Sequence, residues 1–230
     1  MLALIAPDKK YVNDLLQKVG KEKEKSPVDT DIYKCTYKEH EFLIMVTGYG
    51  KVNLGSALCY LRQNYPVKVI FQLGTAGSIN DSNDVFGAVI PSSVLQYDVD
   101  FTCVGYSPAQ VPLLGKGVYQ TNSDLVECAQ RACEICGVNY SNDLIASADM
   151  YVYNNNLASS IRREYNAGAV DCECGSVGQF AYQNQIPFVC VKVISNFANN
   201  NSVRQYNLYD EEASKTCQRI AYKFLKEYYE

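Results

Sequence analysis

The chain has 230 residues, 47% of them hydrophobic, and a formal net charge of −4. Its length suits one large domain with a substantial core. No run of lysine or arginine exceeds two residues, which argues against a nucleic-acid partner. No apolar stretch approaches the length of a membrane span, and residues 1–7 are too short for a signal peptide, so we expect no membrane partner and a cytoplasmic location.

Strand patterns and helical patterns alternate along the chain. Residues 1–6 predict a buried first strand, and the pattern at 10–19 predicts a helix. A polar connection at 20–27 then leads to two strands joined by a turn at 38–40. The continuous apolar run at 67–73 is typical of a strand that is buried on both faces.

The complete set of expected elements is typical of the α/β class. Ser123 is the expected N-cap of the third helix. No linker, repeat or low-complexity tract interrupts the pattern, so we expect one domain over residues 1–230 with a mostly buried mixed sheet. Strands are expected at 1–6, 32–37, 41–47, 67–73, 85–94, 143–146 and 188–194, and helices at 10–19, 53–63, 123–136, 155–164, 174–184 and 211–229.

Ten cysteines are spread along the chain. Most fall in apolar, periodic segments of a chain that is large enough to fold without disulfides, so we expect reduced, buried thiols. Cys133 and Cys136 have CxxC spacing, but they lie in a helical pattern without a second cysteine pair, and His40 is the only histidine. The sequence therefore predicts no metal site and no redox pair.

Polar residues at strand ends and at one helix start are the candidates for a functional site. Glu173 precedes the helix at 174–184, and Ser195 and Asn196 follow the strand at 188–194. Ligands of open α/β sheets bind beyond the carboxyl ends of the strands, so we expect Glu173 and Asn196 in one pocket. The small residues at 74–78 follow another buried strand, and they either cradle a ligand or form an ordinary turn.

Two further loops have alternative interpretations. Tyr151, after the strand end at Ser147, can stack on a planar base, and Asp149 can hold a loop or a hydroxyl, although 19 tyrosines make packing the commoner role. The glycines of residues 48–55 suggest a dinucleotide loop, but the third glycine falls two residues late. A tight turn that lets a helix pack closely on the sheet explains these glycines without a cofactor.

Together these segments resemble the nucleoside phosphorylase/nucleosidase superfamily, and most of all its bacterial 5′-methylthioadenosine/S-adenosylhomocysteine nucleosidases. The resemblance covers nearly the whole chain. It implies a three-layer α/β/α sandwich with a central mixed sheet, and an enzyme of purine salvage that cleaves the N-glycosidic bond of purine nucleosides without a cofactor, with phosphate as an alternative co-substrate. The matching segments, in chain order, are 47–53, 74–77, 96–100, 105–106, 110–112, 147–149, 170–173 and 194–196.

The resemblance also implies roles for individual residues. The carboxylate of Glu173 would bind the ribose hydroxyls and help stabilise an oxocarbenium-like transition state, with Cys172 against the sugar. Tyr151 would stack on the base, and the backbone of Val152 would meet the base edge. The remaining implied contacts are Thr75, Ala76 and Gly77 near the base and the reacting side of the sugar, and Val104 and Pro112 in the 5′ pocket of a neighbouring subunit, which implies a homodimer.

Asn196 departs from the pattern of the adenine-specific relatives. They carry at this position the aspartic acid that protonates N7 of the leaving base. An amide cannot act as a general acid, but its NH₂ can donate to O6 of a 6-oxopurine while its oxygen accepts N7–H. We therefore expect a preference for inosine-type or guanosine-type nucleosides over adenine nucleosides.

The residues at the positions that would bind the nucleophile also depart from the pattern of the relatives. In hydrolytic relatives an acid after the first strand holds the attacking water, and here that position falls on Tyr11, with Asp8 as a substitute from another angle. In phosphorolytic relatives one phosphate-binding arginine stands at the position of Gln72. We expect hydrolysis; the alternative phosphate ligands are Lys9, Lys10, Lys192 or a neighbour's His40.

Lys192 stands in a central strand, where a charge usually needs a partner. We interpret it as a tether to Glu173 or Asp171, with a solvent-reaching side chain as the alternative. Two interpretations of function remain open from the sequence. The first is a purine nucleosidase, and the second is a catalytically weakened relative that binds nucleosides, which the absence of both expected acids favours.

Overall fold

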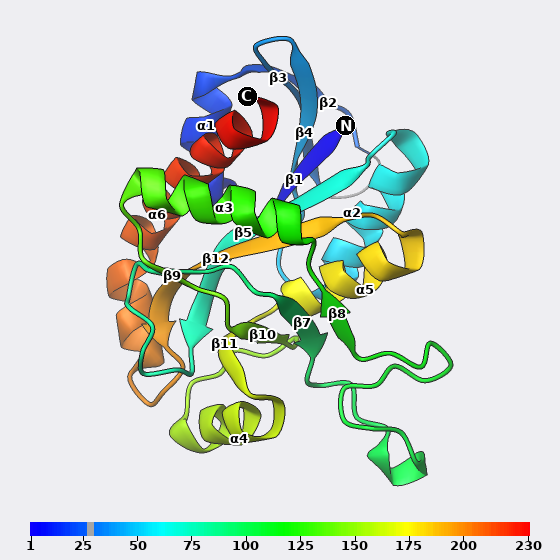
Figure 1. Ribbon diagram of the computed structural model, residues 1–230, viewed down its shortest axis with the longest axis vertical. Helices are drawn as coiled ribbons and strands as arrows, with labels where there is room; N and C mark the ends of the chain where they lie inside the picture. The colour runs from blue at the N-terminus through cyan, green and yellow to red at the C-terminus, as the bar shows by residue number, and fades with distance from the viewer. Residues whose placement is uncertain (27–29) are drawn as a thin grey trace.

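Side chains of the strands point alternately to the two faces of the sheet, and helices cover both faces, so the molecule has three layers (Figure 1). The computed structural model describes residues 1–26 and 30–230, and in this part of the chain twelve strands form one mixed sheet. The strands are β1 (Leu2–Ala6), β2 (Gly20–Glu24), β3 (Asp31–Tyr37), β4 (His40–Val46), β5 (Val69–Ser78), β6 (Ala88–Val89), β7 (Ser93–Gln96), β8 (Val118–Gln120), β9 (Tyr140–Ser141), β10 (Leu144–Ser147), β11 (Ala167–Asp171) and β12 (Phe188–Phe197).

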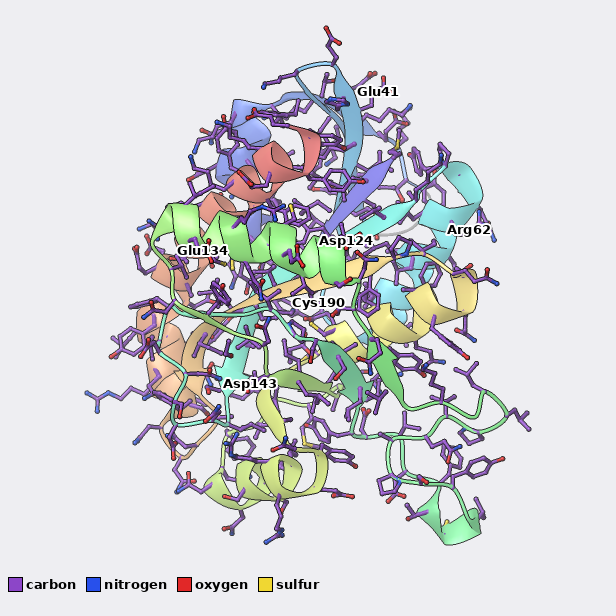
Figure 2. All side chains as sticks on the ribbon, viewed as in Figure 1. Glu41, Arg62, Asp124, Glu134, Asp143 and Cys190 are labelled. Atoms are coloured by element: carbon purple, nitrogen blue, oxygen red, sulfur yellow. The ribbon has the colours of Figure 1, made fainter. Side chains whose placement is uncertain are left out.

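Helices cover both faces of this sheet. Phe71 and Leu73 of β5 belong to the core that the sheet shares with α1, α3 and α6, whereas Ile70 belongs to the core shared with α2 and α5. The predicted α/β/α sandwich is therefore confirmed, and Figure 2 shows Cys190 of β12 inside it and Arg62 of α2 at its edge. The helices are α1 (Asn13–Lys18), α2 (Lys51–Asn64), α3 (Ser123–Cys136), α4 (Asn155–Tyr165), α5 (Cys174–Asn184) and α6 (Ser202–Tyr229), with 3₁₀ turns η1 (Lys9–Tyr11) and η2 (Thr102–Val104).

The strand pairing leaves an opening in the middle of the sheet. β12 runs parallel to β5 along most of its length, from Phe188 opposite Ile70 to Phe197 opposite Ser78. On the other side, β5 pairs first with β1, as far as Gln72, and later with β11, from Gly77 onward. Among the described residues no strand pairs with 73–76 on this second side, and Thr75 and Ala76 of this stretch line a cavity.

Two predicted strands are longer than expected. β5 continues through 74–78, and β12 continues through Ser195 and Asn196, both of which were expected to lie in loops beyond the strands. The ladder is made by backbone groups, so polar or small side chains that face a cavity do not end it. The helix expected at 211–229 likewise begins at Ser202, because its first turns are too exposed to give an apolar pattern.

Other expected boundaries also need correction. Residues 20–24 form β2 instead of a connection, and the charged side chains of this edge strand pair across to β3, for example Lys34 with Glu24 at 2.9 Å. The expected strand at 85–94 is interrupted at Pro91, which lacks an N–H for the ladder. The N-cap of α3 is Asn122, whose side chain accepts from the Leu125 N–H, and not Ser123. Residues 27–29, at the end of the expected connection, lie outside the described residues.

All ten cysteines are free thiols, as predicted, and most of them are buried. Cys133 and Cys136 lie on α3, in agreement with their helical pattern. Within residues 1–26 and 30–230, no group of three or more His, Cys, Asp or Glu residues is placed to hold a metal ion. No helix in the same ranges is long and apolar enough to cross a membrane.

Candidate active site

A cavity of about 230 Å³ opens where the carboxyl ends of β5, β11 and β12 meet. It contains nine of the residues selected from the sequence, including both Glu173 and Asn196. The other two, Val104 and Pro112, lie outside it, in and after the turn η2. The residues that line the cavity are Tyr49, Thr75, Ala76, Gly77, Met150, Tyr151, Val152, Val170, Asp171, Cys172, Glu173, Ser195, Asn196 and Tyr206.

A bulge in β12 places Asn196 at the cavity. Ile194 lies opposite Ala76 and Asn196 opposite Gly77, so Ser195 is an extra residue in the ladder. The Ser195 hydroxyl donates to Asn196 Oδ1 at 3.0 Å, and Asn196 Nδ2 donates to the Phe197 carbonyl at 3.2 Å. Each polar end of the amide therefore keeps one free position, a proton on Nδ2 and a lone pair on Oδ1, for a ligand.

Lys192 joins the two acidic residues of the cavity. Its ammonium lies 2.7 Å from Glu173 Oε2 and 2.9 Å from Asp171 Oδ2, and its side chain is 0% exposed. This confirms the predicted tether and makes the solvent-reaching alternative wrong. Gly74 leaves room for this group, because a side chain there would begin 3.0 Å from Lys192 Nζ.

Burial and the ion pairs shift the two carboxyl groups in opposite directions. Burial raises the pKa of Glu173 above its ordinary value, and the Lys192 ammonium opposes this only in part. Burial also acts to raise the pKa of Asp171, but Lys192 and hydrogen bonds from Ser147 and Cys174 together hold it below its ordinary value. The environment therefore favours the ionised form of Asp171 more than that of Glu173.

Glu173 has one oxygen available to a ligand. Oε2 accepts from Lys192, whereas Oε1 is buried and has no hydrogen-bond partner among the described residues. Glu173 is also the N-cap residue of α5, yet its side chain makes no capping bond, so the helix does not occupy Oε1. Beside it, burial and the carboxyl groups of Glu173 and Asp171 raise the pKa of the Cys172 thiol to about 12. Cys172 therefore lines the cavity as a neutral, weakly nucleophilic thiol.

The loop that carries Tyr151 is fixed to the glycine turn by Asp149. Its carboxylate accepts from the Lys51 N–H at 2.8 Å, at the start of α2. Gly50 has a φ of 90°, and a side chain there would begin 3.2 Å from the same carboxylate, so glycine is required by both conformation and space. The tight-turn interpretation is thus confirmed at Gly48 and Gly50, which both have positive φ, and Asp149 holds a loop. At Gly55 no atom lies within 4 Å of an added side chain, so close packing does not explain this glycine.

Five of the lining residues were not among the catalytic and substrate-binding residues predicted from the sequence, and two of these five are aromatic. Tyr49 comes from the glycine turn and Tyr206 from α6, and the rings of Tyr151 and Tyr206 meet edge to face at 6.1 Å. Met150 and Val170 complete the apolar part of the wall. Among 19 tyrosines, no pattern distinguishes those that reach the cavity. Asp171 was considered only as a possible partner of Lys192, although it ends β11 two residues before Glu173.

Comparison with known proteins agrees with this geometry. The model of the phosphorylase superfamily matches residues 1–227. The chain belongs to the phosphorylase superfamily. It is 26% identical over 227 residues to the 5′-methylthioadenosine/S-adenosylhomocysteine nucleosidase of Staphylococcus carnosus, a match that covers 98% of this chain and 99% of the relative.

Solved structures match the phosphorylase superfamily fold over almost the whole chain. The nucleosidase of Neisseria meningitidis, in complex with methylthio-immucillin-A, superposes with a TM-score of 0.92 and 22% identity over 98% of both chains. The futalosine hydrolase of Helicobacter pylori superposes with a TM-score of 0.91 and 18% identity, covering 98% of this chain and 97% of the other. The predicted fold and superfamily are therefore confirmed.

In a member of the phosphorylase superfamily, cationic side chains at the cavity would be needed to bind phosphate. None of the lining residues named above is a lysine, arginine or histidine. Lys192 is held by two carboxylates, and the Lys10 ammonium lies 2.6 Å from Asp210. Gln72 is buried and accepts from the Cys174 thiol, while Asp8 accepts from the Lys10 N–H and so caps η1. The described cavity thus offers no free cation from its own chain.

Proposed function

We propose that this protein is a nucleosidase that cleaves the N-glycosidic bond of purine nucleosides. The observation that carries the proposal is the unpartnered Oε1 of Glu173, buried in a cavity that also holds the free hydrogen-bonding positions of Asn196. A carboxylate oxygen of this kind suits a donor pair such as the ribose hydroxyls. The amide suits the edge of a purine base, which has both donors and acceptors.

The charges of the site favour the same reaction. Two carboxyl groups share one ammonium, so the site carries one excess negative charge when both are ionised. Ribose hydroxyls that donate to Glu173 Oε1 stabilise its ionised form and lower its raised pKa. A sugar that develops positive charge as the glycosidic bond breaks is then stabilised by a preorganised anion in a partly closed site.

Water is the nucleophile that the cavity supports best. Phosphate would need cations, and the lining of the cavity supplies none. The test is release of free base from methylthioadenosine and inosine, with and without phosphate. Base release that is independent of phosphate supports a hydrolase. Release only in the presence of phosphate contradicts it, and binding without release favours the weakened relative.

Two substrate classes follow from different observations. Two of the three proteins named above are 5′-methylthioadenosine/S-adenosylhomocysteine nucleosidases, which makes a 5′-substituted adenine nucleoside the first candidate. Asn196 makes a 6-oxopurine nucleoside the second, because a neutral amide has no acidic proton to give to a leaving adenine. The ratio of kcat/KM values for methylthioadenosine and inosine separates the two.

The substitution Asn196→Asp is expected to shift this ratio toward methylthioadenosine, by about 10²-fold if a general acid is created. Asn196 Nδ2 now donates to the Phe197 carbonyl, so a carboxyl group placed there is favoured in its protonated form by burial and by that acceptor. Asn64→Asp is the matched control, since Asn64 Nδ2 also donates to a backbone carbonyl, that of Tyr60, but on α2 away from the cavity. An unchanged ratio contradicts the role of Asn196 in base selection.

We also propose a homodimer in the cytoplasm. Val104 is 67% exposed and Leu113 is 99% exposed, so the segment that also contains Pro112 presents apolar side chains to solvent. A second copy of the chain would cover them. Sedimentation in solution tests the assembly, and a monomer at all concentrations contradicts it.

A further inference from the structure

Three hydroxyl groups, those of Thr75, Tyr11 and Tyr49, form a chain beside the cavity. The Thr75 hydroxyl lines the cavity and lies 2.9 Å from the Tyr11 hydroxyl. The Tyr11 hydroxyl lies 3.3 Å from that of Tyr49. Tyr11 is buried, whereas Tyr49 is 47% exposed. Tyr49 also lines the cavity, so the chain runs from Thr75 on β5, through a buried phenol, to a half-exposed residue of the cavity wall.

The partners of Tyr11 differ from those of the other buried tyrosines. The hydroxyls of Tyr37 and Tyr119 donate to groups that can only accept, Glu230 and the Lys116 carbonyl, and their direction is fixed. Both partners recorded for the Tyr11 hydroxyl are themselves hydroxyls. Each member of the chain can donate or accept, so the direction of all its hydrogen bonds can reverse together.

The environment keeps Tyr11 neutral. Burial raises the pKa of Tyr11 far above its ordinary value, with smaller effects from Tyr49 and Asp210. A phenol of this kind cannot act as a fixed base, but it can accept one proton while it gives up another. The 3.3 Å step is longer than an ordinary O–H···O bond, and contacts of this type often shorten when substrate binds.

We propose that Thr75, Tyr11 and Tyr49 relay a proton from the attacking water to solvent. The proposal rests on the proposed hydrolytic function. The C1′–N9 bond breaks with its electron pair going to the base, which takes a proton from solvent. The water oxygen bonds to C1′ and passes a proton to Thr75, which passes its own to Tyr11, which passes its own to Tyr49, which releases one to bulk water. No carboxylate is required on this side of the sugar.

Two pairs of variants test the relay. Tyr11→Phe removes only the central hydroxyl, and we expect kcat for base release to fall about 10²-fold, the usual size of a positioned proton transfer. Tyr119→Phe is its matched control, since Tyr119 is equally buried and its hydroxyl bonds to the Lys116 carbonyl away from the cavity. Thr75→Ser keeps a hydroxyl and should retain most activity, whereas Thr75→Val should lose as much as Tyr11→Phe.

The solvent isotope effect separates a relay from a purely structural role. In mixtures of H₂O and D₂O, wild-type kcat should depend on the deuterium fraction as a curve, because several protons move together. In Tyr11→Phe the curvature should disappear. A fall in kcat with unchanged curvature contradicts the relay, and so does activity within threefold of wild type. If Tyr11→Phe fails to fold, equal activity of Thr75→Ser and Thr75→Val overturns the relay, and a large difference supports it. A wild-type protein that releases no base from either nucleoside contradicts the proposed function and the relay together.

Discussion

Lys192→Met is expected to lower the free energy of unfolding by about 3–5 kcal/mol at pH 8, the usual effect of removing one partner from a buried ion pair. The substitution leaves the carboxyl groups of Asp171 and Glu173 buried without the ammonium that now lies within 2.9 Å of both. Urea unfolding followed by circular dichroism measures the change. Lys34→Met is the control, because its pair with Glu24 lies on the surface and should contribute less than about 1 kcal/mol.

The destabilisation should also depend on pH. Without the ammonium, burial and mutual repulsion raise the pKa of Asp171 and Glu173 above the values in the unfolded chain. At pH values between the unfolded-state pKa and the folded-state pKa, the folded state binds more protons than the unfolded state. The free energy of unfolding of the variant therefore falls as pH rises through this range. Lys192→Met should therefore be closer to wild type at pH 5 than at pH 8. A loss that is equal at both values would mean that packing, and not charge, is the main role of Lys192.

Glu173→Gln is expected to lower kcat/KM for base release by about 10²–10³-fold, the usual cost of removing a preorganised group that stabilises transition-state charge. The amide keeps the shape of the side chain but loses the charge opposite the sugar. Because Lys192 keeps Asp171 as a partner, the fold should persist, and a thermal melt checks this. Glu41→Gln, at an exposed position on β4, is the control for the chemical change.

The pH profile gives Glu173→Gln a second readout. The pKa of Glu173 is raised by burial, and the proposed mechanism needs its ionised form, so wild-type kcat/KM should fall as the pH drops through that pKa. The glutamine does not titrate, so this fall should be absent from the variant. Activity within threefold of wild type, with the acid limb intact, would remove Glu173 from the mechanism.

Local patterns were sufficient to predict the positions of Glu173 and of the charge at Lys192. The change from a buried strand to an amphipathic helix locates Glu173, and the helix at 174–184 has the predicted bounds. The single charge in the apolar run of β12 indicated that Lys192 needs a partner, and the structure supplies two. These features depend on residues close together in the sequence, or on the rule that a buried charge is paired.

The positions of Asn196, Tyr11 and Tyr49 in the folded molecule could not be derived from local patterns. Asn196 was expected beyond a strand and lies within one, because a bulge depends on how two distant strands pair and not on the residues of either strand alone. Tyr11 and Tyr49 come from a 3₁₀ turn and a glycine turn that are 38 residues apart, and their hydroxyls meet only in the folded molecule. No spacing rule links them.

The bulge at Ser195 also has a consequence for how this site can evolve. Lys192, which is paired with both acids, and Asn196, which the proposed function places against the base, lie on one strand but on opposite sides of the extra residue. Among the described residues, the side chain of Asn196 hydrogen-bonds to Ser195 and to the backbone of Phe197. If the proposed function is correct, a substitution at residue 196 changes the groups that face the base and leaves the contacts of Lys192 with Asp171 and Glu173 in place. Recognition of the base and charge at the sugar are then set by separate residues of one strand.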